Sequence, residues 1–476
     1  MTTTSTQKYH AFAVERRGTE YISPESRTGR PLDLALMWGG AVTNIVPVVF
    51  GGLLPLMGLS IAQCITVVII GSLSWAAVGV ISCSGPEAGT TTFMVSRAPF
   101  GSNGNRICGF FTWLIALGFE ATFMILVVQA GMALAGKAGA SQGDATKVIT
   151  ILVVGLLIPI TAVYGHATLV KVLSYLSLPF IASYILLAII VIPKAQHLHQ
   201  SGSFGTVLIG LSLVVAAAGF GFSPQAADYS RYLPATVNKR ALFWATSVGG
   251  FIPTTLLLML GVLIGTKLTY GIDAVSGIPG LAPAWFAVPY LIVISIQIIA
   301  ADGFALYSSG VTLQAIGLKA KRWQCVVIDT AICVVVTFIA VFSHQFDTIL
   351  TDFLLFTNVF VAPWAAIFML DWLLRRGKYD VASLQTTRGG LYWRQGGFRL
   401  PALIALAGGM VAALLWINTA PFVGPFSSRT GDSDLSWAVG MIVSGVLYLL
   451  LGARQTRIEA GQSTADISDA ALPVNT

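Results

Sequence analysis

The sequence predicts an all-α integral membrane protein with twelve transmembrane helices. Ten of them form two five-helix repeats of opposite orientation, and two more follow at the C-terminal end. The first observation is composition, because mean hydropathy is +0.80 and only 10% of the residues are charged, against about 25% in soluble proteins. The second is a series of apolar segments of the length that a bilayer requires. The third is a pair of interrupted segments at corresponding places in the two repeats.

Each transmembrane helix needs about 20 largely apolar residues. Twelve segments meet this condition, at roughly 33–57, 61–83, 108–136, 148–165, 169–193, 206–226, 241–266, 285–309, 323–342, 349–374, 400–418 and 435–452. With the N-terminus inside, the loops assigned to the inside carry most of the 27 Lys and Arg residues. The positive-inside rule therefore predicts a multi-pass protein of the plasma membrane with both termini in the cytoplasm.

The spans divide the chain into six parts. We expect an N-terminal tail at 1–31, a first repeat at 32–193, a second repeat at 206–374, a cytoplasmic linker at 375–399, two further helices at 400–453 and a C-terminal tail at 454–476. The tail at 1–31 has no apolar core of a cleaved signal peptide. The ends, 1–20 and 455–476, are poor in large apolar residues, which predicts disorder.

Two of the apolar segments cannot be continuous helices. The first contains Gly39-Gly40 and Thr43-Asn44 before Pro47, and the sixth, Leu211–Pro234, contains Gly219-Phe220-Gly221-Phe222-Ser223-Pro224. Gly and Pro free backbone groups from the helical ladder, and inside lipid those groups need a protein, water or ligand partner. Because each repeat has an odd number of spans, the sixth span enters from the side opposite to the first. Paired breaks of this kind indicate a binding site at mid-depth.

Two acidic residues fall well inside predicted spans. Glu120 lies in the third span with no basic residue near it in sequence, and Asp302 lies in the eighth, in line with Ser295 and Ser309. A charge within a bilayer costs a few kcal/mol and marks a functional site by default. Each acid therefore either handles substrate or protons, or forms a structural hydrogen bond to a neighbouring helix.

Other polar residues favour more local explanations. Asp228 and Arg231 are spaced i, i+3 at the end of the sixth span, which indicates an ion pair or a helix cap. Asn358, close to Pro363 in the tenth span, is interpreted as a gate or a packing contact. Asp329 lies near the start of the ninth span, and we expect it at the membrane interface.

Several function classes are disfavoured. HExxH and CxxC motifs and His/Cys clusters are missing from the sequence, so an enzyme, a metal site or a cofactor is not expected. The net charge of +7 follows membrane topology and does not indicate nucleic-acid binding. A channel or receptor would not require paired breaks with buried acids, which favour alternating access.

Four stretches carry a resemblance to a known family. They are Arg97-Ala98-Pro99-Phe100-Gly101-Ser102-Asn103-Gly104, Ala227-Asp228-Tyr229-Ser230-Arg231-Tyr232, Asp302-Gly303-Phe304-Ala305-Leu306-Tyr307-Ser308-Ser309-Gly310 and Asp371-Trp372-Leu373-Leu374-Arg375-Arg376-Gly377-Lys378-Tyr379. Together they resemble motifs of the nucleobase:cation symporter-1 family, the purine–cytosine permeases and their relatives. The resemblance implies the five-plus-five inverted-repeat fold, with a substrate site between the first, third, sixth and eighth spans.

In that family, aromatic residues of the third and sixth spans sandwich a flat heterocycle. The resemblance assigns Phe119 to the first of these positions and Phe220 to the second, with Phe222 as the alternative. Asn44, Glu120 and Asp302 are then the candidate polar partners, and the freed backbone near Gly219 could add more.

The coupling ion is where the sequence departs from the family. Sodium-coupled members place a Ser/Thr pair on the eighth span, where this chain has Ala300 and Ala301, so two oxygens of a cation site are lost. With Glu120 and Asp302 added, we expect protons rather than sodium to be coupled. The sequence thus predicts a monomeric proton symporter that imports cytosine, a purine or a related heterocycle. The alternative is a sodium-coupled or uncoupled carrier of allantoin, hydantoin, a vitamin-like heterocycle or an amino acid, although an amino acid has no use for the aromatic pair.

Overall fold

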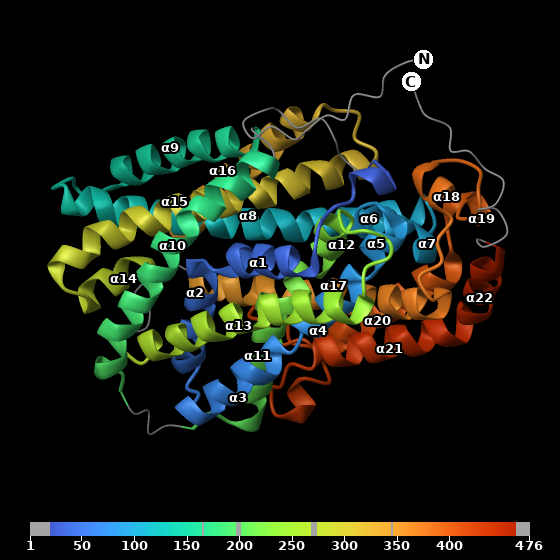
Figure 1. The fold of residues 1–476 in the computed structure, drawn as a ribbon. Coiled ribbons are helices and arrows are strands. Elements are labelled where there is room, and N and C mark those ends of the chain that lie inside the picture. Colours follow the sequence, from blue (N-terminus) through green and yellow to red (C-terminus); the bar gives the residue numbers. More distant parts are fainter. Residues whose placement is uncertain (1–19, 164–165, 197–200, 268–273, 344–345, 463–476) are drawn as a thin grey trace, which may run out of the picture.

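The computed structural model describes residues 20–163, 166–196, 201–267, 274–343 and 346–462. Over these residues the regular structure is helical, apart from one isolated bridge between Asn418 and Val423. The helices run roughly side by side in one elongated bundle (Figure 1). The prediction of an all-helical protein is therefore confirmed.

The first half of the chain begins with two short helices separated by a bend and contains one helix of 34 residues, α8. Its helices are α1 (Pro31–Val42), α2 (Ile45–Leu56), α3 (Ile61–Ser72), α4 (Trp75–Ser82), α5 (Ser84–Ala88), α6 (Thr92–Val95), α7 (Arg97–Phe100), α8 (Gly104–Lys137), α9 (Asp144–Val163) and α10 (His166–Val191).

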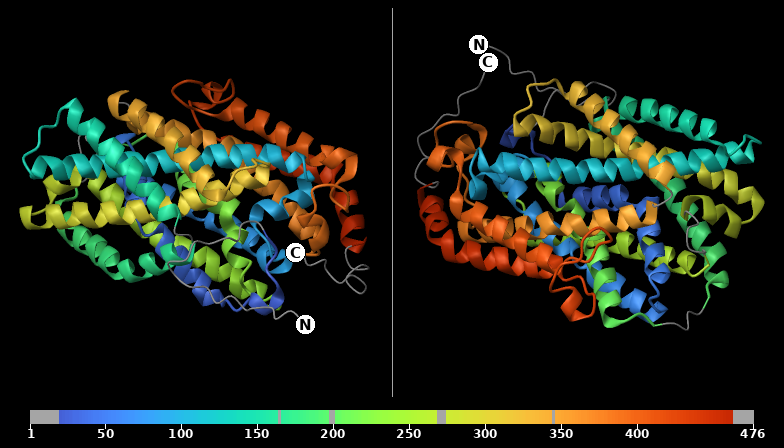
Figure 2. Two further views of the ribbon diagram at one scale, coloured as in Figure 1. Left: turned by 90° about the horizontal axis from the view of Figure 1, so that it is seen from above. Right: turned by 180° about the vertical axis from the view of Figure 1, so that it is seen from behind.

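The second half begins with an interrupted helical segment, contains helices of 27, 33 and 30 residues, and ends with two adjacent helices and a short C-terminal helix. Its helices are α11 (Phe204–Val215), α12 (Ala226–Ser230), α13 (Lys239–Gly265), α14 (Ala274–Leu281), α15 (Ala284–Ile316), α16 (Arg322–Ser343), α17 (Phe346–Arg375), α18 (Val381–Gln385), α19 (Arg394–Gly397), α20 (Leu400–Trp416), α21 (Ser436–Leu451) and α22 (Ala453–Gln462). Helices α20 and α21 lie side by side along one flank of the bundle (Figure 2).

Within the described residues, eight helices are long and apolar enough to cross a membrane, or up to ten if each of two bent pairs is one span. The predicted spans at 148–165 and 169–193 coincide with α9 and α10, which flank residues outside the described part of the chain. The chain is thus a multi-pass membrane protein, and the count of twelve stays a prediction.

The first break lies between α1 and α2, whose axes are bent by 58°. Asn44 caps α2, because its Oδ1 accepts a hydrogen bond from the Val46 N–H at 2.9 Å, while its Nδ2 donates to the Ala41 carbonyl at 3.0 Å. The Thr43 hydroxyl donates to the Gly39 carbonyl at 2.6 Å, and the Gln297 amide donates to the Thr43 carbonyl. The freed backbone groups therefore have partners inside the protein, as a lipid environment requires.

The second break is a π turn, Ala216–Phe220, in which Ala218 has the non-helical angles φ −92° and ψ −113°. The Gly219 N–H donates to the Ser74 hydroxyl at 2.9 Å. A Cβ atom at Gly219 would lie only 2.2 Å from the Ser74 carbonyl carbon, so a glycine is needed for this approach. Ser74 lies between α3 and α4, where the second span is interrupted. Its hydroxyl therefore provides a hydrogen-bond partner for the backbone of the break in the sixth span.

The predicted linker at 375–399 is folded back on the bundle. It contains α18 and α19, and the Arg97 guanidinium donates to the Leu384 carbonyl at 2.8 Å. Burial lowers the pKa of Arg97 to about 10, which still leaves it charged at neutral pH. The linker thus closes over the loop that carries α7.

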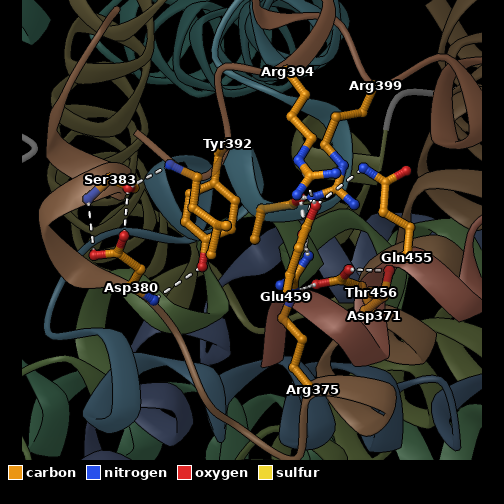
Figure 3. Close-up of polar contacts among 12 residues, drawn as sticks. Asp371, Arg375, Asp380, Ser383, Tyr392, Arg394, Arg399, Gln455, Thr456 and Glu459 are labelled. Carbon is orange, nitrogen blue, oxygen red and sulfur yellow. Dashed lines mark hydrogen bonds and ion pairs between the residues drawn. The ribbon is translucent and has the colours of Figure 1, made fainter. Parts of the chain in front are cut away.

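A buried ion cluster fixes the C-terminal helix α22 (Figure 3). The Glu459 carboxylate lies 3.0 Å from Arg375 and 2.5 Å from Arg399, and Arg375 also pairs with Asp371 at 2.7 Å. Both arginines donate to the Ala98 carbonyl of α7. The cluster therefore joins the end of α17, the linker, α7 and α22.

The prediction of a disordered tail from residue 455 is wrong for 455–462. These residues form most of α22, in which Thr456, Glu459 and Ala460 are buried. Composition misled the prediction because this helix is held by buried ion pairs and not by an apolar face. Residues 1–19 and 463–476 lie outside the described part of the chain.

We predict that Glu459→Gln lowers the free energy of unfolding by about 3 kcal/mol, because it leaves Arg375 and Arg399 with one buried carboxylate fewer. Heat-induced loss of monodisperse protein in detergent measures the effect. Glu25→Gln is the control, since Glu25 is exposed. Equal midpoints for the two variants would contradict the prediction.

Candidate functional site

A cavity of about 100 Å³ lies where the two breaks meet α8 and α15. Its walls are mostly apolar and aromatic, with a few polar groups from α8, α15 and the second break. The lining residues include Trp38, Asn44, Phe50, Thr112, Phe119, Phe123, Gly221, Phe222, Gln225, Tyr229, Ala301, Ser308, Ser309 and Thr312. A small, aromatic-walled cavity with few polar groups is the usual form of a site for a small organic ligand.

One wall is a cluster of aromatic rings around Trp38. Its ring meets those of Trp75, Phe222 and Tyr229 edge-on, with centroids 5.4, 5.9 and 5.2 Å away. Phe222 is stacked on Trp75 at 5.2 Å and 21°. Because each ring is held by its neighbours, this wall is rigid and already shaped before a ligand enters.

Phe119 lies on the other side of the cavity. Its ring packs edge-on against Phe353 at 5.1 Å and lies close to Gly221, where a Cβ atom would come within 3.1 Å of it. Phe119 therefore contacts the second break directly, and its position depends on the absence of a side chain at Gly221.

The structure separates the two aromatic candidates of the sixth span. Phe222 lines the cavity, whereas Phe220 is 3% exposed and packs edge-on against Trp437 of α21, with centroids 6.3 Å apart. Side chains two positions apart in a helical segment project in nearly opposite directions. The geometry thus favours the alternative, Phe222, and directs Phe220 toward the C-terminal hairpin.

Two other predicted residues hold the breaks. Asn44 lines the cavity, but both polar atoms of its amide already bond to the backbone of the first break. The Gly219 N–H is likewise taken by Ser74. These two residues shape the cavity; the Gly219 N–H is used in doing so, while the Asn44 amide keeps one N–H and one oxygen lone pair.

The polar lining residues that were not predicted include Gln225 and Trp38. The Gln225 amide makes no hydrogen bond to any described residue, and the Trp38 Nε1–H is buried without one. Gln225 follows Pro224 directly, so a polar side chain next to a predicted break was the signal that could have found it. Both groups remain able to bond to a ligand.

The acids Glu120 and Asp302 lie behind the cavity wall and are fully buried. Glu120 Oε2 accepts a hydrogen bond from the Cys333 thiol at 3.7 Å, while Glu120 Oε1 and both carboxylate oxygens of Asp302 have no hydrogen-bond partner among the described residues. The two carboxyl groups are close enough to interact electrostatically.

A third acid, Asp329, belongs to the same cluster. It accepts hydrogen bonds from the Ser309 hydroxyl at 2.7 Å and from the Trp113 indole at 2.8 Å, and it is 0% exposed. The expectation of an interfacial Asp329 is therefore wrong. Seven residues separate it from the start of α16, which places it two turns inside the helix and facing α8 and α15.

The remaining predicted residues have structural surroundings. Asp228 accepts hydrogen bonds from the Thr92 N–H at 2.8 Å and the Thr92 hydroxyl at 3.0 Å, so it caps α6, with Arg231 close enough to attract it. Asn358 donates to the Ser212 carbonyl and hydroxyl at 2.9 and 3.0 Å. Asn358 thus makes a packing contact between α17 and α11.

A metal site is not evident in the described residues, which contain no group of three His, Cys, Asp or Glu side chains able to hold an ion. The carbonyls of the first break that could serve a cation also have donors. The Gly39 carbonyl accepts a hydrogen bond from the Thr43 hydroxyl, and the Ala41 carbonyl accepts one from the Asn44 amide. The Thr43 carbonyl accepts one from the Gln297 amide.

Two proteins that this chain resembles in sequence are both named as purine-cytosine permeases. YxlA of Bacillus subtilis, whose name assigns it provisionally to the purine-cytosine permeases, is 29% identical over 465 residues, covering 94% of this chain and 98% of that protein. The purine-cytosine permease fcyB of Emericella nidulans is 26% identical over 478 residues, covering 92% of this chain and 88% of that protein.

A solved structure shows the same fold. The inward-facing conformation of Mhp1 superposes with a TM-score of 0.75 over 98% of this chain and 100% of that one, at 15% identity. A family model described as a permease for cytosine/purines, uracil, thiamine and allantoin matches residues 21–440. The chain therefore belongs to this permease family, the nucleobase:cation symporters, and is a membrane transporter and not an enzyme.

Proposed function

We propose that this transporter imports cytosine, a purine or a related planar heterocycle across the plasma membrane by proton symport with alternating access. The observation that carries the proposal is the aromatic cavity between the two breaks, with an unpaired acid cluster directly behind its wall. Family membership supports the substrate class, and the acid cluster supports the ion.

The cavity suits a flat ring. Phe119 from α8 and the rigid wall of Trp38 and Phe222 offer faces and edges for offset stacking. The Gln225 amide, which has both donors and an acceptor, can then bond to the edge of the heterocycle. In this proposal Asn44 and Gly219 position the walls, and Phe220 does not contact the substrate.

The cavity is displaced toward one end of the bundle. Its residues on α8 and α15 include Thr112 and Thr312, which lie in the parts of these helices nearest the loops at 84–103 and 317–321. Basic residues assign those loops to the cytoplasm. In this proposal the cavity belongs to an inward-directed state of a protein with twelve spans, and the two breaks act as its hinges.

The first break favours protons over sodium. Ala300 and Ala301 offer no side-chain oxygens, and the Gln297 amide donates to the Thr43 carbonyl, where a cation would need a free oxygen. The buried acids, in contrast, have no cation near them among the described ion pairs. Such acids are stable when protonated, because an unpaired charge in low dielectric is costly.

Transport in proteoliposomes tests the proposal. Radiolabelled cytosine, adenine or hypoxanthine is expected to accumulate when the outside is more acidic than the inside. A protonophore should abolish accumulation, while replacing sodium by choline should not. Flux without accumulation would indicate a channel or uncoupled carrier, and strict sodium dependence would favour the sodium-coupled alternative.

We predict that Phe222→Ala weakens binding of the transported heterocycle by about 1–3 kcal/mol, because a stacking face is lost. Phe220→Ala is the matched control, since the same ring is removed from a position that faces α21. Scintillation proximity binding of the labelled substrate to purified protein gives both affinities. An unchanged affinity for Phe222→Ala, with a loss for Phe220→Ala, would reverse the assignment.

Glu120→Gln is expected to abolish uphill transport and its pH dependence, because the amide cannot exchange a proton. Exchange of labelled for unlabelled substrate at equal pH should persist, since no net proton movement is needed. Uptake with a wild-type pH profile would assign Glu120 to a purely structural role.

A further inference from the structure

The acid cluster and the cavity share one residue, Ser309. This serine lines the cavity, its hydroxyl donates to Asp329 Oδ2 at 2.7 Å, and it is close enough to the Glu120 carboxyl to interact with it. Because its proton is directed at Asp329, its lone pairs are left to accept a hydrogen bond from a protonated Glu120. Ser309 thus stands between two acids at the wall of the site.

We propose that Asp329 is a third proton-binding residue of this transporter and that Ser309 passes the proton between Glu120 and Asp329. The inference rests on the proposed proton symport. In the transfer, Glu120 gives its proton to the Ser309 oxygen while Ser309 gives its own to Asp329. Glu120 becomes ionised, Asp329 becomes neutral, and the serine is unchanged.

The depth of the three residues gives the transfer a direction. Along α16, Asp329 lies one helical turn, roughly 6 Å at 1.5 Å per residue, nearer to the start of the helix than Cys333, whose thiol donates to Glu120. The starts of α8 and α16 are at the same end of the bundle, where α15 also ends (Figure 1). Asp329 is therefore the acid of the cluster that is nearest the proposed cytoplasmic exit.

The surroundings of Asp329 contain acids and thiols. Glu120 on α8 is close enough to interact with Asp329, and Asp302 on α15 interacts in turn with Glu120; Cys325 and Cys333 lie on the same helix as Asp329. The charged residues of α9, Asp144 and Lys147, pair with each other at 3.1 Å in its first turn.

The other neighbouring charges are engaged or distant. On α17, Asp352 accepts a hydrogen bond from the Ala420 N–H at 2.9 Å. Arg106 lies exposed in the first turn of α8. Three buried acids without a paired cation in the described part of the chain cannot all be ionised at once, so at least one proton is held among them.

The Trp113 contact is the competing structural explanation. Its indole donates to Asp329 Oδ1 at 2.8 Å, so Asp329 could act only as an acceptor that fixes Trp113 and Ser309. An asparagine at 329 keeps an acceptor oxygen but cannot bind and release a proton, whereas phenylalanine at 113 removes the donor and leaves the acid. The two substitutions therefore separate the explanations.

The test uses full-length protein in proteoliposomes loaded with a pH-sensitive dye. We expect Asp329→Asn to retain exchange of labelled for unlabelled cytosine at equal pH, but to lose cytosine-driven proton entry by at least tenfold. Ser309→Ala should likewise retain exchange and lose cytosine-driven proton entry, but by a smaller factor. Trp113→Phe should retain both activities, as should Asp352→Asn, the matched loss of an aspartate outside the cluster.

The outcomes are distinct. Proton entry in Asp329→Asn with a wild-type pH profile would overturn the inference. The inference would also fail if Asp329→Asn and Trp113→Phe each lost exchange and proton entry to the same extent, because Asp329 would then have a structural role. Absence of cytosine-driven proton entry in the wild-type protein would refute the symport itself, and the inference with it. If the wild-type protein couples proton entry to cytosine and Asp329→Asn does so equally well, the inference fails while the proposed symport stands.

Discussion

The structure depends on how backbone groups are satisfied where two apolar helices are interrupted. A membrane interior supplies no water, so each freed N–H or carbonyl needs a protein partner. At the first break Thr43, Asn44 and Gln297 provide these partners, and at the second Ser74 does. These bonds fix the breaks at mid-bundle, and the cavity exists because α8 and α15 pack around them.

The need to satisfy backbone groups at the breaks divides the polar residues into those that bond to the breaks and those that can bond to a ligand. Asn44 uses half of the hydrogen-bonding capacity of its amide on the first break, whereas the Gln225 amide and the Trp38 indole make no hydrogen bond to the described residues. The acids are kept one layer further out, behind Ser309, where they meet neither lipid nor bulk water. A single hydroxyl is thus common to the site of the heterocycle and the proposed site of the proton.

Hydropathy predicted an all-helical membrane protein, and glycine–proline placement directed attention to the bend between α1 and α2 and to the π turn at 216–220. The count of twelve spans stays a prediction, as does the role of Phe119 to which the family motifs pointed. Sequence spacing could not decide between Phe220 and Phe222, because a π turn changes which residue faces inward. It also missed Asp329, since nearness to a span end suggested the interface, while only the packing of α16 on α8 and α15 shows its burial. The helix α22 escaped notice because its stabilising contacts are with residues far away in the chain.

The ion cluster around Glu459 has a consequence for biosynthesis. Glu459 follows Arg375 by 84 residues and Arg399 by 60, so both arginines are synthesised long before this carboxylate, and until then only Arg375 has a carboxylate partner, Asp371. Until α22 emerges, this end of the bundle holds an excess of buried positive charge and stays incompletely packed. Docking of α22 therefore depends on contacts between residues far apart in the chain, which form slowly relative to local helix contacts.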